Sequence, residues 1–312
     1  MAEFNLQDEL KRYGPRPEQP VVVSPRKARR YCRRLARTHY ENFTVVSWLL
    51  PRRLRQHFCN LYAYCRWADD LADEAGDPKL ALALLNWWEG QLRACYQGQA
   101  AHPVFIALKD TIKKHDLPQD PLLDLLAAFR QDQRVRRYET LDQVIDYCRY
   151  SANPVGRLVL HLGGCATPER ARLADSICTG LQLANFCQDV AADWDRGRVY
   201  MALVDCRRFG YEGPMFAARE CNEAFRRLLK VYCDHAEDFL RGGWPLVTLL
   251  PYELQLGVAA FVHGGLAVLA AIRRQDYAVW TARPKVTRLE KLRILARCWW
   301  RHQRGTLAGS EP

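Results

Sequence analysis

Two short stretches of the sequence place carboxylates at helical spacing. The first carries a phenol, a guanidinium and two carboxylates, in Tyr62, Arg66, Asp69 and Asp73. On a helix that turns about 100° per residue, these four side chains fall within about 60° of one another, with Asp70 to the side. Two aspartates one turn apart can bind or bridge a divalent cation, so this stripe predicts a metal site.

The second stretch repeats the pattern with two amides before its two carboxylates. On a helix, four of its side chains fall within an arc of about 80°: Gln182, Asn185, Asp189 and Asp193. Their neighbours are strongly apolar, which predicts a helix that is buried on most sides. Such a helix does not keep ionisable groups without partners, because an unpaired buried charge is strongly destabilising.

Binding of Mg²⁺ would explain the carboxylates of both stripes. Mg²⁺ takes oxygen ligands, usually one or two carboxylates together with water and phosphate oxygens. Two such helices could hold a diphosphate through Mg²⁺, and the neutralised diphosphate would then leave and generate an allylic carbocation. The alternative for either stripe alone is a solvated face or ion pairs with arginine. Two stripes of the same form favour the metal site.

The elements that must position these stripes are expected to be helices throughout. Ser24, Thr140 and Thr167 are placed as N-caps, and Pro follows two of them at the first helical position. No stretch shows sustained two-residue alternation, so no sheet is expected. The sequence therefore predicts an all-α, single-domain bundle of about ten or more helices. We expect them near residues 25–42, 52–74, 80–97, 103–115, 121–137, 141–150, 154–163, 168–194, 214–240, 246–276 and 285–302.

The domain is expected to span residues 24–302. Residues 1–23 contain several prolines and predict a flexible, loosely ordered arm, and residues 303–312 predict a C-terminal tail. No signal peptide is expected, since the first residues lack an apolar segment. The longest apolar region, residues 246–272, is interrupted by Pro251 and by polar side chains. That composition favours a buried core helix over a membrane span.

Cysteine usage and charge narrow the class of protein. The 12 cysteines are scattered without a CxxC pair, which favours reduced core residues in a cytoplasmic protein over disulfides or zinc. The net charge of +11 implies an anionic partner or a solvated basic face. Zinc spacing and an RNP-like aromatic motif are both absent, so nucleic acid is not expected. An acidic membrane surface and a diphosphate remain as candidate partners.

The two stripes together resemble the squalene/phytoene synthase family. Tyr62 and Arg66 match its YxxxR, and Asp69 and Asp73 match its DxxxD. The second stripe is similar to its QxxNxxxDxxxD, followed by a D-x-x-R-G-R-x-Y tail that ends at Arg198 and Tyr200. The resemblance covers roughly residues 25–300. It implies the isoprenoid synthase fold, which is an α-helical bundle around a large apolar cavity.

The resemblance also implies roles for individual residues. Mg²⁺ ligands would be Asp69, Asp73, Asn185, Asp189 and Asp193. The four aspartates of this set would also be catalytic residues, together with Tyr62 and Asn153. Contacts to the substrate would come from Arg66, Gln182, Arg198, Tyr200 and His39. The basic run of Arg283, Lys285, Arg288 and Lys291 would close over the diphosphate or face lipid.

Three departures from the family pattern point to one of its branches. The N-terminal diphosphate segment reads His39-Tyr40-Glu41-Asn42-Phe43. The segment at 147–156 has Ser151 and Asn153 where relatives have Val and Gly. Relatives carry a tyrosine in the region of His263-Gly264-Gly265. Together they resemble the hydroxysqualene synthase branch of bacterial hopanoid pathways. Enzymes of that branch convert presqualene diphosphate to hydroxysqualene with water and without NADPH. Asn153 would hold that water or, alternatively, cap the helix that begins at Pro154.

Other functions stay open at this stage. One is head-to-head condensation of two prenyl diphosphates to presqualene diphosphate, squalene or phytoene. Another, in a different class, is a non-catalytic basic helical scaffold that binds membranes. For the enzyme we expect peripheral attachment to the inner face of the cytoplasmic membrane, with other enzymes of the squalene pathway as further candidate partners.

Overall fold

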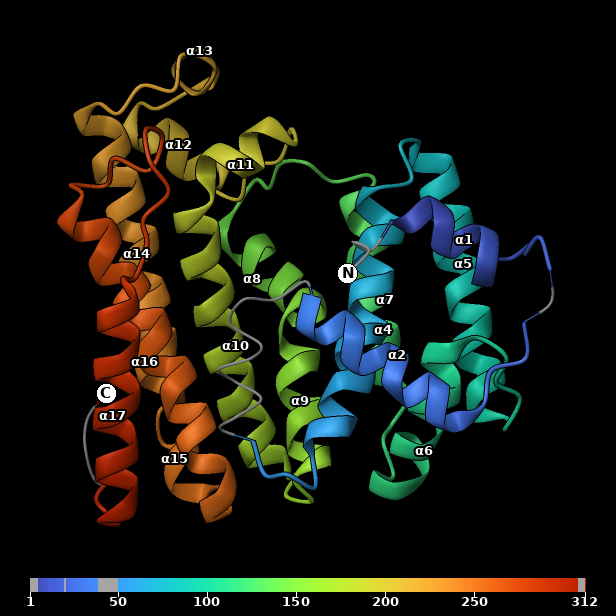
Figure 1. Cartoon of the computed structure of the whole chain (residues 1–312). Helices are drawn as coiled ribbons and strands as arrows, with labels where there is room; N and C mark the ends of the chain where they lie inside the picture. The colour runs from blue at the N-terminus through green and yellow to red at the C-terminus, as the bar shows by residue number, and fades with distance from the viewer. Residues whose placement is uncertain (1–4, 20, 39–49, 308–311) are drawn as a thin grey trace. The chain divides into compact units, whose positions relative to one another are not determined.

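The chain divides into two compact units that are both built from helices. The computed structural model describes residues 5–19, 21–38, 50–307 and 312. The first unit comprises residues 1–134 with 161–164, and the second comprises residues 135–160 with 165–312 (Figure 1). In the described ranges every regular element is a helix, which confirms the predicted all-α class. The sequence predicted a single bundle, whereas the contacts separate the chain into two units.

The first unit contains six complete helices in its described residues. They are α1 (Leu6–Tyr13), α2 (Pro25–Thr38), α4 (Arg55–Asp73), α5 (Pro78–Tyr96), α6 (Pro103–His115) and α7 (Asp120–Asp132). The arm predicted over residues 1–23 is wrong where α1 lies. Asn5 caps this helix, Leu6 is buried, and the Tyr31 hydroxyl donates to Glu9 at 2.8 Å. The three prolines that suggested disorder all follow α1 and do not interrupt it.

One face of α4 forms the core of the first unit. Tyr64, Trp67 and Leu71 are fully buried, and Trp67 stacks on Trp88 of α5 with ring centroids 5.2 Å apart. Both polar tips on this face have partners, since Tyr64 donates to the Leu122 carbonyl at 2.8 Å and Trp67 donates to the Tyr31 hydroxyl at 2.9 Å. This packing fixes the rotation of α4 and leaves the face with the polar stripe outside the core.

The second unit is arranged around α10. Its helices are α8 (Leu141–Ser151), α9 (Asn153–Leu162, up to residue 160), α10 (Pro168–Gln188), α11 (Val190–Asp195), α12 (Leu203–Phe209), α13 (Gly213–Ala217), α14 (Glu223–Gly243), α15 (Leu246–Leu249), α16 (Tyr252–Arg274) and α17 (Arg288–Gln303). Thr167 caps α10 by accepting from the Arg170 amide at 3.2 Å, as the sequence predicts. The short helix α12 was not expected.

Small residues allow α10 and α14 to approach closely. A Cβ atom added at Gly180 would lie 2.8 Å from Leu240 Cγ and 2.9 Å from the Ala236 carbonyl oxygen. The same holds at Gly243, where an added Cβ would lie 2.9 Å from the backbone nitrogen of Ile177. The two helices therefore pack backbone against backbone, and larger side chains at these positions would push them apart.

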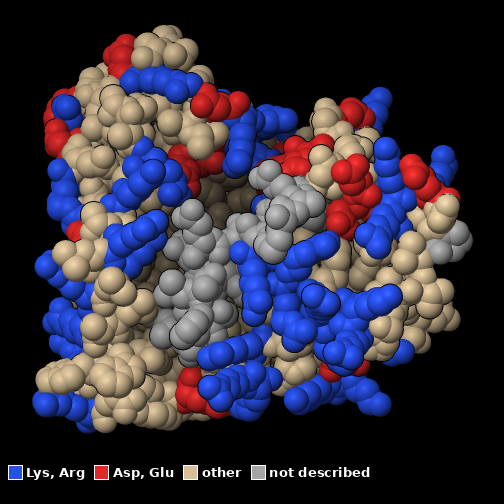
Figure 2. All heavy atoms as spheres, in the orientation of Figure 1, with Lys and Arg blue, Asp and Glu red and all other residues tan. Residues whose placement is uncertain are grey.

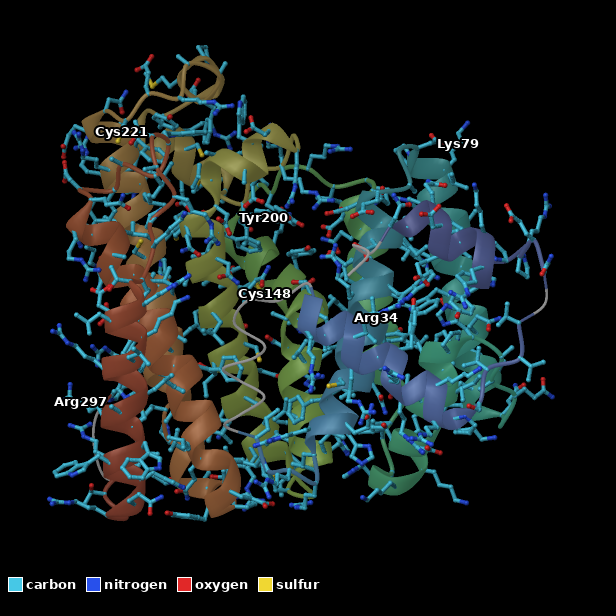
Figure 3. All side chains as sticks on the ribbon, viewed as in Figure 1. Arg34, Lys79, Cys148, Tyr200, Cys221 and Arg297 are labelled. Carbon is cyan, nitrogen blue, oxygen red and sulfur yellow. The ribbon has the colours of Figure 1, made fainter. Side chains whose placement is uncertain are left out.

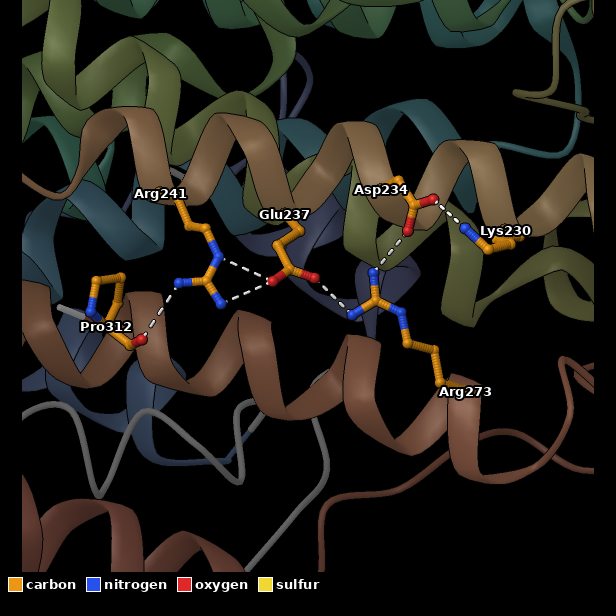
Figure 4. A network of polar contacts seen from close by, with 6 residues as sticks. All are labelled: Lys230, Asp234, Glu237, Arg241, Arg273 and Pro312. Carbon is orange, nitrogen blue, oxygen red and sulfur yellow. Dashed lines mark hydrogen bonds and ion pairs between the residues drawn. The ribbon is translucent and has the colours of Figure 1, made fainter.

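An ion-pair network joins α14 to α16 at their surface (Figure 4). Arg273 donates to Asp234 at 2.8 Å and to Glu237 at 2.5 Å, and Arg241 adds a bond of 2.8 Å to Glu237. Lys230 completes it by donating to Asp234 at 2.6 Å. Because α14 and α16 both contact α10, this network ties together two helices of the bundle around α10.

The helix α16 covers most of the apolar region that the sequence singled out. It is long and apolar enough to cross a membrane by length and composition, and 39% of its most apolar window is buried. Gly265 lies against Leu181 of α10 and Leu240 of α14. These contacts place α16 within the second unit's bundle, as expected of a core helix.

The cysteines occupy core positions and form no disulfides. All 12 are free thiols, and nine of them are buried. Burial raises the pKa of most of these thiols, for example that of Cys59 to about 11. The predicted use of cysteine as a small apolar residue is confirmed.

Candidate active site

The first stripe lies on the side of α4 opposite its core face. Tyr62 and Asp69 are half-buried and Asp73 is exposed, near the carboxyl end of the helix. Arg66 lies between them and forms an ion pair with Asp69, with Nη1 and Oδ2 3.3 Å apart. The structure thus brings together the four residues that the helical spacing predicted.

Asp70 is a residue of this site that the sequence analysis set aside. Its side chain is buried, and its carboxylate accepts a hydrogen bond of 3.0 Å from Arg66 Nε and a second, shorter bond from Arg66 Nη2. Burial raises the pKa of Asp70 to about 7, with Arg66 opposing the rise and the neighbouring Glu74 and Asp69 adding to it. The i,i+4 spacing of Arg66 and Asp70 was the signal that could have identified this pair.

The second stripe spans a helix junction. We expected one helix over residues 168–194, but α10 ends at Gln188, and Asp189, with φ −106° and ψ 19°, separates it from α11. The register is kept, because the Asp189 amide donates to the Asn185 carbonyl at 2.9 Å and the Asp193 amide donates to the Asp189 carbonyl at 2.8 Å.

Most of the α10 surface around this stripe is buried. Leu183, Ala184 and Phe186 are buried, whereas Asn185 is exposed and Asp189 is half-buried. Together with buried Cys187, Gln188 and Val190, the three buried residues confirm a helix buried on most sides, with the stripe on its open side. The polar side chains of the stripe are accessible to a ligand and do not need a buried partner.

Arg283 neutralises the carboxylate of Asp189. Its guanidinium forms a two-bond ion pair with that carboxylate, in which Nη2 lies 2.9 Å from Oδ2. The same Nη2 donates to Gln188 Oε1 at 2.9 Å, and Gln188 in turn donates to the Pro284 carbonyl at 2.6 Å. The hydrogen bond to Asp189 raises the pKa of Arg283. The segment before α17 is therefore fixed onto the second stripe.

The tail after the second stripe is fixed by backbone contacts. Gly197 has φ +75°, a conformation that favours glycine, and its carbonyl accepts from Arg137 at 2.6 Å. The Val199 amide donates to the Arg136 carbonyl at 3.0 Å, and Arg198 beside it is half-buried. These bonds place Tyr200 against α10.

Tyr200, which is labelled in Figure 3, belongs to a cluster of stacked aromatic rings. It is buried and stacks on Phe186 of α10 with ring centroids 3.7 Å apart, while Tyr138 and Tyr147 stack at 5.9 and 5.8 Å. Phe186 follows Asn185 in the chain, so the cluster couples the tail to the second stripe. The predicted substrate contact through Tyr200 stays a prediction.

Asn153 serves the packing of three helices. It is the first residue of α9, and its buried amide lies 3.0 Å from Thr179 Oγ1 of α10. With the amide nitrogen turned toward Thr179, it also reaches the carbonyls of Asp175 at 3.1 Å and Cys148 at 3.3 Å. Ser151 differs, because its buried hydroxyl has no hydrogen-bond partner among the described residues. A buried hydroxyl of this kind is a place for a bound water.

The predicted site residues are divided between the two units. The first stripe belongs to the first unit and the second stripe to the second. His39 lies outside the described residues. Within the described ranges, no group of three or more His, Cys, Asp or Glu side chains lies together as a metal site.

The donors themselves fit Mg²⁺. Asp69, Asp73, Asp189 and Asp193 are carboxylates and Asn185 is an amide, so all five offer the oxygen ligands that Mg²⁺ prefers. Each unit alone offers two of the carboxylates one helical turn apart, which leaves most of an octahedral shell to water or phosphate.

Comparison with known proteins agrees with this constellation. A family model described as squalene/phytoene synthase matches residues 36–290. The chain belongs to the squalene/phytoene synthase family. Both stripes, the tail and Arg283 lie inside the matched range. The chain is thereby an enzyme of a family that processes prenyl diphosphates.

Individual members of the squalene/phytoene synthase family support the same placement. Hydroxysqualene synthase of Rhodopseudomonas palustris is 34% identical over 249 residues, covering 78% of this chain and 83% of the relative. Phytoene synthase of Arthrospira platensis is 28% identical over 277 residues, covering 85% and 90%. The crystal structure of squalene synthase HpnC from Alicyclobacillus acidocaldarius matches with a TM-score of 0.78 and 46% identity, covering 83% and 97%. The predicted isoprenoid synthase fold is confirmed.

Proposed function

We propose that this enzyme converts presqualene diphosphate to hydroxysqualene in a Mg²⁺-dependent reaction of squalene and hopanoid biosynthesis. The observation that carries the proposal is the likeness to the hydroxysqualene synthase of R. palustris, at 34% identity over most of both chains. The 46% identity to HpnC supports the same branch. The phytoene synthase likeness keeps head-to-head condensation as the second candidate.

The proposed reaction begins by breaking a carbon–oxygen bond. The diphosphate leaves with the bonding electron pair, and the resulting cyclopropylcarbinyl cation rearranges. Mg²⁺, when held by the oxygen donors of either stripe, would neutralise the diphosphate and make it a better leaving group. The guanidinium groups of Arg66 and Arg198 would bind the diphosphate oxygens. Gln182 of the second stripe and Tyr200 of the tail would make further contacts to the substrate.

Water ends the proposed reaction by adding its oxygen to the cation and releasing a proton. No hydride donor is then needed, and we propose that NADPH takes no part. Asn153 is a weaker candidate for holding the water than its sequence position suggested, because its amide is engaged by Thr179. Ser151 supports the proposal better, since its buried hydroxyl is two residues from Asn153 and has no described partner.

The test offers two substrates to the purified enzyme. Presqualene diphosphate and farnesyl diphosphate are supplied separately with Mg²⁺ and without NADPH, and lipid products are identified by mass spectrometry. Hydroxysqualene from the first and nothing from the second is the expected result. A condensed product from farnesyl diphosphate would replace the proposed branch with a synthase. If neither substrate gives a product, and Asp69→Ala and Asp189→Ala leave membrane binding intact, the non-catalytic scaffold would be favoured.

We also propose that the enzyme works at the inner face of the cytoplasmic membrane. Its substrate and product are strongly apolar, and its net charge of +11 favours an anionic surface. Enzymes that make or consume the same lipids would be its neighbours there.

A further inference from the structure

The helix α17 packs on the second unit with one face only. Cys298 and His302 are buried on that face, and Ile294 and Leu295 are half-buried beside them. The packing partner is α16, where Tyr252 stacks on His302 with ring centroids 3.8 Å apart. This single face is enough to anchor α17, so the rest of the helix is not required for the core.

A second face of α17 is apolar and exposed. The exposed fractions are 56% for Leu289, 62% for Leu292, 55% for Trp299 and 49% for Trp300. On a helix these four side chains and Ala296 fall within an arc of about 100°. Trp299 and Trp300 are the only exposed tryptophans in the described ranges. Single exposed apolar residues are ordinary, but a continuous stripe with two tryptophans marks an interaction surface.

Arginines border this apolar stripe along the helix. They are Arg288, Arg293, Arg297 and Arg304. These four arginines form no ion pair with any residue that the structure describes. Figure 2 shows Lys and Arg side chains spaced along the α17 edge with uncharged atoms between them. In Figure 3, Arg297 lies on the side of α17 that faces away from α16.

The helix is already formed without a partner. Thr287 and Glu290 make a reciprocal capping box at its start, with bonds of 2.8 and 3.2 Å. Glu290, the single carboxylate of α17, is also paired with Arg274 at 2.9 Å. Arg304 lies 3.7 Å above the Trp300 ring, which holds one tryptophan beside a cation. Binding to this face would therefore cost little ordering of the chain.

We propose that this face of α17, from Leu289 to Arg304, is the surface by which the enzyme attaches to an anionic lipid membrane. An interfacial helix buries an apolar face at the level of the lipid headgroups while its cations contact anionic lipids, and tryptophan prefers that boundary. Two copies of the chain meeting through this face would place one set of arginines against the other. Charge complementarity therefore selects an anionic surface over self-association.

The inference deepens the proposed membrane location and does not depend on which reaction the two stripes carry out. Most of α17 lies beyond residue 290, where the match to the family model ends. The attachment surface is thus separate from the two stripes, and it overlaps the basic run of Arg283 to Lys291 only at its start. Its loss should change where the enzyme resides, and not the chemistry that it performs on dissolved substrate.

The experiment measures binding without any substrate. The purified chain is sedimented with vesicles of phosphatidylcholine alone or mixed with phosphatidylglycerol, at about 0.1 M and about 1 M salt. We expect binding to the anionic vesicles at low salt. Arg293→Gln with Arg297→Gln should weaken it by about thirtyfold, since each cation near an anionic surface contributes about a factor of five. Trp299→Ala with Trp300→Ala should weaken the binding that remains at high salt.

Matched controls separate this surface from general effects of charge and apolarity. Arg227→Gln removes an exposed arginine of α14, and Leu80→Ala truncates an exposed apolar residue of α5. Both should bind vesicles as the unchanged chain does. All variants should keep their melting temperature and their activity on detergent-dissolved substrate. Inactivity of the unchanged chain would count against the proposed function alone.

Two outcomes would overturn the inference. Equal vesicle binding by the α17 variants and the unchanged chain would place membrane contact elsewhere or nowhere. A dimer in light scattering that the tryptophan variants convert to a monomer would show that the face joins two copies. Brominated lipid gives a direct readout, because it should quench tryptophan fluorescence in the unchanged chain and much less in the double tryptophan variant.

Discussion

Arg283 and Asp189 form a two-bond ion pair at the end of α10, with Nη2 and Oδ2 2.9 Å apart. A carboxylate whose two oxygens both accept from a guanidinium cannot also offer them freely to a metal ion. The first stripe has a parallel arrangement, since Arg66 is bonded to Asp69 and Asp70. In each unit an arginine thus occupies the position where a divalent cation is proposed to act.

The first prediction concerns competition between Arg283 and Mg²⁺. Arg283→Gln removes the guanidinium from Asp189, so Mg²⁺ or Mn²⁺ should bind the substrate-free enzyme more tightly, by several-fold. Isothermal titration measures this affinity, and Arg227→Gln on the surface of α14 is the control. Unchanged affinity would show that Arg283 does not compete for this carboxylate.

The second prediction concerns the carboxylates themselves. Asp69→Asn and Asp189→Asn keep the size of the side chain but remove its charge, and each should lower kcat/KM by about a hundredfold or more. Asp146→Asn, an exposed residue of α8 paired with Arg149 at 3.1 Å, should leave kcat/KM unchanged. Steady-state kinetics and melting temperatures distinguish lost chemistry from lost folding. Full activity in both active-site variants would remove the metal site from the proposal.

The third prediction separates Ser151 from Asn153. Ser151→Ala removes a buried hydroxyl that has no described partner, so stability should hold while hydroxysqualene falls as a share of total product. Asn153→Ala breaks the contact to Thr179 and should lower the free energy of unfolding by about 1–3 kcal/mol. Product analysis and urea unfolding measure the two effects. An unchanged product distribution in Ser151→Ala would exclude it as the residue that holds water.

The fourth prediction uses a buried histidine in the aromatic core of the first unit. His102 caps α6 by accepting from the Val104 amide at 3.2 Å, and it is surrounded by Trp67, Trp88 and Phe105. Burial lowers the pKa of His102 to about 3. As pH falls below 6.5 the unfolded chain takes up a proton that the folded chain refuses, so stability should fall by about 1.4 kcal/mol per pH unit.

A capping substitution tests the same effect. His102→Asn keeps a good capping residue but cannot titrate, so its free energy of unfolding should depend less on pH between 6.5 and about 3. Urea unfolding across that range measures the slope, and NMR should show the His102 ring of the unchanged chain neutral until the pH approaches about 3. A ring that gains a proton near pH 6 in the folded chain would contradict the assignment.

The sequence predicted relations within one helix better than contacts between segments that are distant in the chain. Helical spacing predicted that Arg66, Asp69 and Asp73 share one face, because that relation depends only on the geometry of one helix. It could not place Arg283 on Asp189, since 94 residues separate them and no periodicity links a loop to a helix end. The break at Asp189 was also missed, because a change of backbone angles at one residue leaves the i,i+4 pattern intact.

Burial of individual side chains was the other quantity that the sequence could not provide. The apolar neighbours of Asn185 and Asp189 correctly indicated burial on most sides of the helix, but they could not show that the stripe itself stays accessible. Asp70 is the opposite case, because a charged residue next to Asp69 looked peripheral and is in fact buried against Arg66. Which side of a helix meets the core depends on partners distant in sequence.

The last prediction tests whether the close approach of α10 and α14 positions the second stripe. Gly180→Ala adds a Cβ that would lie 2.8 Å from Leu240, so overpacking should outweigh the higher helix propensity of alanine and lower stability by about 1–2 kcal/mol. Gly90→Ala in α5 meets open space and should instead raise stability by up to about 1 kcal/mol. Opposite signs in thermal unfolding are the expected result. Because Asn185 lies about one and a half turns beyond Gly180 and Asp189 directly follows the end of α10, Gly180→Ala should also lower kcat, whereas Gly90→Ala should not. Equal effects of the two alanines would mean that the α10–α14 contact yields without strain.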